Sequence, residues 1–266
     1  MKFLSSLAAA LVLALPLAAW AHDSWLLPSS TVLSGDDAWI TVDAAVGNDK
    51  FYFNHRAMRL DNLAVAAPDG SAVAPQNVAA GHLRGTFDLN LSQRGTYRIA
   101  VVNDGVFARW EENGQPRRWF GKPADLQANV PAGATKVQVS QSYSRVETFV
   151  TAGKPSKVKP VGQGLELALL SHPNDLYAGE SATFQLLIDG VPAPGLKVNV
   201  VRGGGRHRDQ VGETELTSDA AGKFSIEWPQ AGMYWLHADA EDGKTTVAQA
   251  AKRRLAYTAT LEVLPQ

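Results

Sequence analysis

The stretch Val137–Val150 reads Val-Gln-Val-Ser-Gln-Ser-Tyr-Ser-Arg-Val-Glu-Thr-Phe-Val. Its second half places Tyr143, Arg145, Glu147 and Phe149 at every other position. Because successive side chains of a β-strand point to opposite faces of the sheet, these four side chains would share one face. The stretch therefore predicts a long β-strand rather than a helix.

The same alternation recurs along the chain from Trp25, and turn-forming residues such as Pro68-Asp69-Gly70 separate the runs. We find no amphipathic helix of any length, and we expect residues 51–60 to form a structured loop or a short helix. Short strands at this spacing favour an all-β fold made of β-sandwiches. Besides 137–150, the expected strands are 38–44, 63–67, 85–91, 96–102, 165–170, 181–188, 197–201, 213–217, 223–228, 233–238 and 256–263.

Changes of composition divide the chain into three parts. We predict a signal peptide at 1–21, an N-terminal β-sandwich domain at 22–152 and a C-terminal immunoglobulin-like (Ig-like) β-sandwich domain at 165–266. The segment 151–164 is rich in Gly, Pro and Lys, which is typical of a linker or a long crossover loop. The two halves are similar in expected architecture but not in sequence, so we predict no internal repeat.

The N-terminus has the three-part pattern of a secretory signal. Lys2 supplies a positive charge, Phe3–Leu17 is mainly apolar, and Ala19-Trp20-Ala21 carries small residues where a signal peptidase cuts. The apolar run is shorter than the ~20 residues that a membrane-spanning helix needs, and no later stretch is apolar enough to span a bilayer. We therefore expect cleavage after Ala21 and a mature periplasmic protein that begins with His22 and has no membrane span.

Composition narrows the classes of function. The 266 residues carry a formal net charge of −1 and include no cysteine. A charge this close to zero argues against nucleic acid as a partner. The absence of cysteine removes thiol catalysis and cysteine-ligated zinc. We find no Gly-x-Ser-x-Gly elbow, no phosphate loop and no carboxylate pair that stands out as catalytic, so we do not predict an enzyme.

His22 is the strongest candidate for a metal ligand if it begins the mature chain. Its amine and its ring have pKa values of about 8 and about 6.5, so both nitrogens can give up protons to a metal near neutral pH. With one more histidine they would form a T-shaped brace of nitrogens, which suits Cu(II) or Ni(II). The alternative is that His22 is merely the first residue of a frayed terminus.

Four further residues are candidate ligands. His55 lies in an aromatic-rich run, where the alternative is a core-facing ring bonded to backbone. His237 would face the sheet surface opposite the core, towards solvent or the other domain. His172 follows an expected strand and Glu147 would add a carboxylate. No His-Glu-x-x-His or His-x-His spacing supports this set.

Phe107–Phe120 is expected to form a hairpin around Asn113-Gly114, a strong turn pair. Trp110 and Trp119 would then face each other across the hairpin and stiffen it. The alternative is a flap that covers a site.

Motifs from both ends of the mature chain point to one family. His22–Pro28 reads His-Asp-Ser-Trp-Leu-Leu-Pro, and Asn174–Glu180, Val191–Val198, Asp219–Phe224 and Gly232–Leu236 follow in the second half. The first motif resembles the mature start of a family of exported proteins of unknown function, described as periplasmic components of cobalt and nickel transport systems. The others resemble its closing Ig-like module. The resemblance covers nearly the whole mature chain and implies a periplasmic protein that binds or delivers nickel or cobalt.

We therefore expect a periplasmic metal-binding protein, accessory to nickel or cobalt uptake. It would hold one divalent transition metal (nickel, cobalt or copper) through His22 and pass it to a membrane metal importer. One alternative is a copper oxidase with an N-terminal histidine ligand. Another is a metal-free β-sandwich interaction module.

Overall fold

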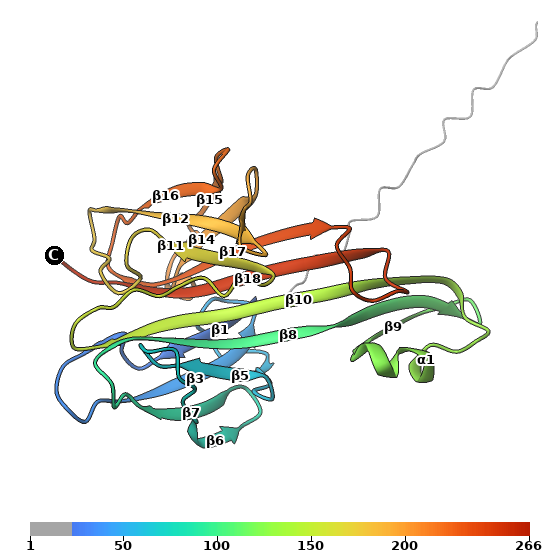
Figure 1. The fold of residues 1–266 in the computed structure, drawn as a ribbon, viewed down its shortest axis with the longest axis horizontal. Helices are drawn as coiled ribbons and strands as arrows, with labels where there is room; N and C mark the ends of the chain where they lie inside the picture. The colour runs from blue at the N-terminus through green and yellow to red at the C-terminus, as the bar shows by residue number, and fades with distance from the viewer. Residues whose placement is uncertain (1–22) are drawn as a thin grey trace, which may run out of the picture.

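The computed structural model describes residues 23–266, which fold almost entirely into β-strands arranged in three sheets (Figure 1). The predicted signal peptide and His22 lie outside the described residues. Within the described part, no helix is long and apolar enough to cross a bilayer. The all-β prediction is confirmed.

The first sheet and part of the central sheet form the N-terminal sandwich. The first sheet has the order β1-β3-β7-β6, and β4 pairs with β3. It faces β5, β8 and β10 of the central sheet, which matches the A-B-E-D and C-F-G sheets of an Ig-like fold. The bounds are β1 Asp23–Pro28, β3 Trp39–Gly47, β4 Arg56–Ala57, β5 Leu63–Ala66, β6 Gln76–Ala80, β7 Gly85–Asn90, β8 Gly95–Glu112 and β10 Thr135–Ala152.

The third sheet and the rest of the central sheet form the C-terminal sandwich. The third sheet contains β11, β12, β13 and β16, and it covers the strands β15-β14-β17-β18. This order again follows the Ig-like pattern. The bounds are β11 Leu165–Leu169, β12 Ser181–Ile188, β13 Val191–Pro192, β14 Lys197–Arg202, β15 Glu213–Thr217, β16 Lys223–Glu227, β17 Gly232–Asp242 and β18 Lys252–Val263.

A parallel pair of strands joins the two sandwiches. Ser140–Thr148 of β10 pairs with Lys252–Thr260 of β18, so the two half-sheets become one nine-stranded central sheet. The first sheet lies below this sheet and the third sheet lies above it (Figure 1). Because side chains alternate along β10, this strand contributes to the cores of both sandwiches. Val146 packs in the core below the central sheet, and Phe149 packs in the core above it.

Each sandwich contains the same tyrosine corner. The Tyr97 hydroxyl donates a hydrogen bond to the Gln93 carbonyl over 3.1 Å, and the Tyr234 hydroxyl donates one to the Gln230 carbonyl over 2.7 Å. Such a bond at the start of strand F is a hallmark of Ig-like domains. The pattern Gln-x-Gly-x-Tyr thus occurs twice, with both glycines at positive φ (137° and 139°). The prediction of no internal repeat missed this local one.

An arm extends the central sheet beyond the sandwiches. It consists of the outer ends of β8 and β10, the strand β9 (Gln115–Gly121) and the short helix α1 (Leu126–Asn129) (Figure 1). Asn113 and Gly114 have φ of 51° and 74°, as the predicted hairpin turn requires. A small core under the arm contains Leu126 and Trp110.

The two arm tryptophans are offset rather than opposite. Trp110 pairs with Arg117, and Trp119 pairs with Ala108. The two tryptophans therefore share a face of the hairpin but are offset by two residues, and the prediction that they lie directly opposite each other is wrong. Both still contribute to the core of the arm.

Residues 51–60 form a loop that contains the two-residue strand β4, so of the two alternatives expected for this described segment the structured loop is confirmed. Residues 153–164 contain no strand, as expected for a connection between sandwiches.

Trp25 is fully buried where β1 meets both sandwiches, whereas Trp39 is 44% exposed on the same sheet. We expect Trp25→Ala to lower the free energy of unfolding by about 3–5 kcal/mol, because it leaves a large cavity. Trp39→Ala is the matched control and should change it by no more than about 0.5 kcal/mol. Urea denaturation of the two variants checks this, and equal effects would contradict the burial of Trp25.

Candidate functional site

The start of β1 is held by contacts from both sandwiches. The Asp23 carboxylate forms an ion pair with the Lys50 ammonium group. Lys50 Nζ also lies 4.4 Å from the centre of the Trp235 ring, and the Trp235 indole N–H donates a hydrogen bond to the Ser24 carbonyl over 3.1 Å. The first described residues of the chain are therefore tied to β17 as well as to their own sheet.

Trp25 anchors this strand from beneath. Its ring contacts Phe51 edge-on at 5.9 Å and Phe53 at 6.5 Å between centroids. Gly47, the register partner of Asp23, allows this packing, since a Cβ there would lie 2.7 Å from the Trp25 ring. A glycine is required by this close approach.

His237 lies beside this anchor on β17. Its ring stacks on Trp235 with centroids 5.1 Å apart and planes at 11°. Its Nδ1 is 3.0 Å from the Thr258 hydroxyl, and its Nε2 is 2.9 Å from the Asp239 carboxylate. The prediction that His237 faces away from its own core is confirmed, because Tyr234, Leu236 and Ala238 point into that core.

His237 and Asp239 offer one nitrogen and one carboxylate on the same face of β17. Their side chains are 24% and 72% exposed, so a bound ion could reach them from solvent. Within residues 23–266, no group of three or more histidine or carboxylate residues could hold a metal.

His55 lies in the loop that wraps around the start of β1. This loop also carries Lys50 and Phe51, which contact Asp23 and Trp25. It is held by the neighbouring Asn54, whose side chain bonds the backbone of Asn48 and the carboxylate of Asp49. His55 itself is half-buried.

His172 has a structural environment. Its Nδ1 accepts a hydrogen bond from the Asn174 N–H over 3.2 Å, so the proton of the neutral ring lies on Nε2. That nitrogen is 3.1 Å from the Ser156 carbonyl and 3.0 Å from the Thr96 hydroxyl. Burial lowers the pKa of His172. Both ring nitrogens therefore form hydrogen bonds, which connect the linker to the two sandwiches. Neither nitrogen is available to bind a metal.

Glu147 is fully buried in a charged network between the central and third sheets. Its Oε1 accepts a hydrogen bond of 2.6 Å from the Tyr257 hydroxyl, and its Oε2 lies 3.4 Å from Arg98 and 3.7 Å from Arg145. Burial, and secondarily the negative charge of Glu147, raises the pKa of Tyr257. Two guanidinium groups at this carboxylate disfavour a bound cation, so Glu147 is best explained as structural.

The structure thus connects His237 to the start of β1 and places His55 in the adjoining loop, whereas His172 and Glu147 lie elsewhere. Sequence reasoning missed Lys50 and Trp235. The alternation Tyr-Trp-Leu-His at 234–237 could have paired Trp235 with His237. The contact of Trp235 with Lys50 depends on the conformation of a loop, which the spacing of residues in the sequence does not predict.

The described residues define an all-β protein of two Ig-like sandwiches joined through one sheet. A family model matches residues 19–242, and the chain belongs to that family, which is described as a domain of unknown function, DUF4198. No curated protein matches the chain.

Several solved structures match the chain at low similarity. The D0-D1 domain of intimin has 11% identity and a TM-score of 0.23, covering 90% of this chain and 97% of its own. A marsupial T cell receptor has 12% identity and a TM-score of 0.22, covering 92% and 74%. Escherichia coli alpha-2-macroglobulin activated by porcine elastase has 11% identity and a TM-score of 0.21, covering 90% and 30%. TM-scores this low carry no argument about function.

The buried neutral His172 should make stability depend on pH. Its native pKa lies below the 6.5 of an ordinary histidine, so the unfolded chain takes up the proton first as the pH falls. The contribution of His172 is complete above that value and is lost progressively below it. We expect the stability difference between wild type and His172→Ala, measured in urea, to shrink between about pH 7.5 and about pH 5.5. The exposed His82→Ala should follow the wild-type profile, and a constant difference for His172→Ala would contradict this assignment.

Removing the buried carboxylate should be costly. Glu147→Leu leaves Arg98 and Arg145 buried without an opposite charge, which is expected to cost about 3–5 kcal/mol. Glu215→Leu breaks only the exposed pair with Lys197 and should cost at most about 1 kcal/mol. Thermal or urea unfolding of both variants distinguishes the two. A small effect of Glu147→Leu would show that Arg98 and Arg145 do not depend on Glu147 for neutralisation.

Proposed function

We propose that this chain is an exported metal-binding protein, accessory to nickel or cobalt uptake, which holds one divalent ion through the mature N-terminal His22. The observation that carries the proposal is the anchoring of β1 from its first described residue. Asp23 is bound by Lys50, and Ser24 is bound by Trp235. The residues that directly follow His22 are therefore fixed to both sandwiches.

Fixing the strand favours chelation for a physical reason. A metal that binds a free terminus must order the chain, and this entropy cost reduces the affinity. In this protein, packing of Trp25 and the ion pair of Asp23 order the neighbouring residues before any metal arrives. The amine and the imidazole of His22 would then act as a pre-organised pair of nitrogen donors.

His237 supports the proposal as an additional donor beside the start of β1. It stacks on the same Trp235 ring that Lys50 covers, and Lys50 in turn binds Asp23. Release of Nε2 from Asp239 would free an imidazole nitrogen, and the carboxylate could serve as a second donor or hold the ring. Nitrogen-rich sets of this kind suit nickel, cobalt or copper ions.

The test begins with the mature protein purified after export. Mass spectrometry should place its N-terminus at His22, and calorimetric titration should show one Ni(II), Co(II) or Cu(II) ion per chain. An added alanine ahead of His22, or His22→Ala, should abolish this binding because each removes a chelating nitrogen. His237→Ala should weaken it by at least about 10–100-fold, the cost of losing a supporting group at a metal.

His82→Ala and His207→Ala are matched controls, since both histidines are exposed, His82 in a loop and His207 in a short 3-10 helix, and should leave binding unchanged. Unaltered binding in the His22 variants would overturn the proposal. Absence of any metal binding would favour the metal-free interaction module. Peroxide formation by the copper form with a reductant would favour the copper oxidase instead.

A further inference from the structure

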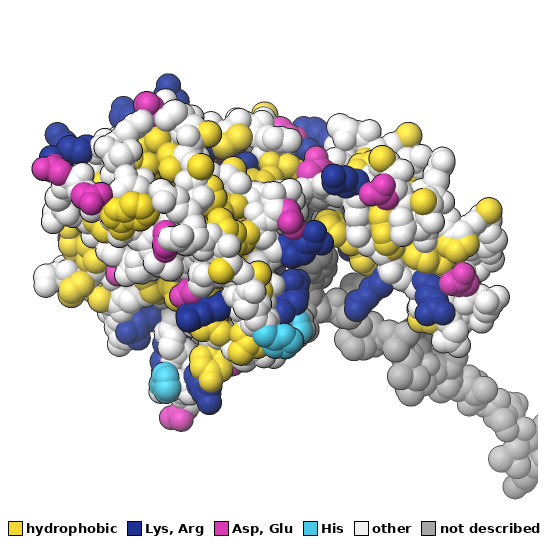
Figure 2. Space-filling view, turned by 90° about the horizontal axis from the view of Figure 1, so that it is seen from below, with side chains coloured by type: hydrophobic (Ala, Val, Ile, Leu, Met, Phe, Trp, Pro, Cys, Tyr) yellow, Lys and Arg dark blue, Asp and Glu magenta, His cyan; other side chains and the backbone are white. Residues whose placement is uncertain are grey.

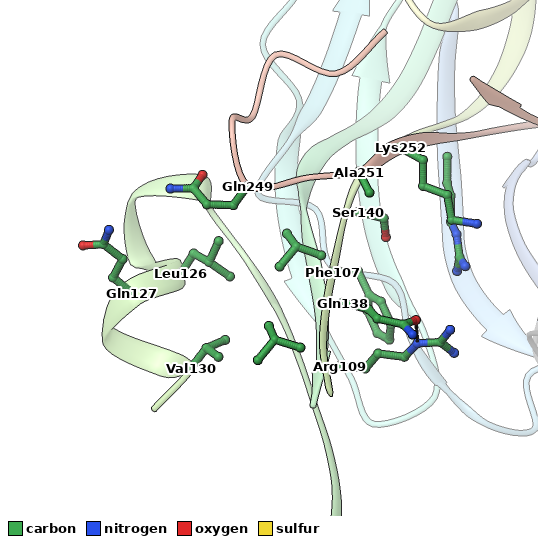
Figure 3. Close-up of a pocket in the computed structure, with 13 residues that line it drawn as sticks. Phe107, Arg109, Leu126, Gln127, Val130, Gln138, Ser140, Gln249, Ala251 and Lys252 are labelled. Carbon is green, nitrogen blue, oxygen red and sulfur yellow. Dashed lines mark hydrogen bonds between the residues drawn. The ribbon is translucent and has the colours of Figure 1, made fainter. Parts of the chain in front are cut away.

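A pocket of about 490 Å³ lies where the arm leaves the sandwiches, and His237 is not among the residues that line it (Figure 3). It surrounds one edge of β10 at the point where β18 begins. Leu126 of α1 and Val130, which follows α1, point towards this edge from one side, and Arg109 and Lys252 lie on the other side. The pocket takes no part in the proposed metal site, so a ligand of the pocket would bind whether or not His22 holds a metal.

The edge of β10 is open at this point. On that side β18 pairs with β10 only from Ser140 onward, and the Ala251 N–H adds one bond of 3.0 Å to the Val139 carbonyl. Gln138 pairs with Arg109 of β8, so the Val137 carbonyl, which shares a peptide group with the Gln138 N–H, points to the opposite, open edge. A register shift of β10 lies between Thr135 and Gln138, where Lys136 has a φ of 52°. The Val137 side chain is 45% exposed. Among the described strands, only β8 pairs with this part of β10, and it occupies the opposite edge.

The two sides of the open edge differ in character. One side is apolar, with Leu126, Val130 and Val139. The other carries Arg109, Lys252 and Arg254, and no lining residue is acidic.

These cations are poorly neutralised. Lys252 and Arg254 share the single carboxylate of Glu241, at 2.7 Å and 3.6 Å. The Arg109 Nε donates to the neutral Gln138 side chain over 2.7 Å. Lys and Arg side chains are visible on both sides of the hollow between the main body and the arm (Figure 2). The charge of the site therefore calls for an anionic ligand.

We propose that this groove binds an extended acidic segment of a partner protein, which adds a strand to the open edge of β10. The backbone of the segment would bond to Val137, as peptides do when they extend an exposed sheet edge. Because side chains of a strand alternate, one set would enter the apolar side under α1 and the other would meet Arg109 and Lys252. The groove thus selects a sequence in which apolar and acidic residues alternate.

The probe is a short synthetic peptide that alternates valine and glutamate, titrated into the full mature protein and followed by calorimetry and amide NMR. It should bind one site and shift the amide signals of Val137 and Val139. The same peptide with lysine in place of glutamate should not bind. Arg109→Gln should weaken binding by about two- to fivefold, as expected for an exposed charge pair, and Arg109→Glu combined with Lys252→Glu should abolish it.

Arg117→Glu is the matched control. Arg117 is an exposed arginine of the same arm, but it pairs with Trp110, so it lies on the opposite face from Arg109. It should leave peptide binding unchanged. Val137→Pro disrupts the backbone of β10 at the open edge and should prevent binding, whereas Val137→Thr keeps that backbone and should not. If Val137→Pro unfolds the arm, the charge variants still decide the matter.

Three results would overturn the proposal. One is equal binding of the acidic and the basic peptide. Another is binding of decanoate in the groove without binding of the peptide, which would identify a site for a small amphiphile. The third is self-association of the chain that buries the groove, seen by sedimentation and abolished by the Arg109 and Lys252 charge reversals.

Discussion

The parallel pairing of β10 with β18 is the interaction on which the rest of the structure depends. Each strand is the last one of its own sandwich, and their nine paired residues turn two half-sheets into one. A flexible linker alone would leave two sandwiches free to move against each other. Here backbone hydrogen bonds fix their relative position, so a contact such as that between Trp235 and Ser24 can be formed by both halves of the chain.

A shared sheet also decides where polar groups become buried. The first and third sheets cover opposite faces, so each covers only part of the central sheet. On the upper face, the linker covers the part of the central sheet that the third sheet leaves open. Its Lys159 carbonyl accepts a hydrogen bond from Arg98, and its Ser156 carbonyl bonds His172. The carboxylate of Glu147 lies within this seam against two arginines. A buried network of this kind stabilises the seam only while every partner stays in place. It therefore favours a single alignment of the two sandwiches.

Local patterns predicted most of the long strands but not β1 or β6, and they did not predict which strands pair. The prediction of a strand at 181–188 coincides with β12, and alternation correctly placed Tyr143 and Phe149 on one face of β10. The pairing of β10 with β18 was beyond reach, because it joins residues more than a hundred positions apart and leaves no local pattern. The same holds for Glu147, whose partner Tyr257 is equally distant. The repeated Gln-x-Gly-x-Tyr corner was visible in the sequence, but its meaning came from the hydrogen bond that it forms.

Alternation along β18 links the surface around His237 to the groove of the arm. Lys252, Arg254 and Thr258 are separated by even steps, so their side chains share the lower face of the central sheet. Thr258 bonds His237, and Lys252 lines the groove. The acidic side chains of a bound segment, which would meet Arg109 and Lys252, would therefore lie on the face that carries the His237 imidazole, whereas its apolar side chains would lie on the opposite face. Because β18 ends its pairing at Lys252 while β10 continues, one difference in strand length creates both the open edge and the positive charge beside it.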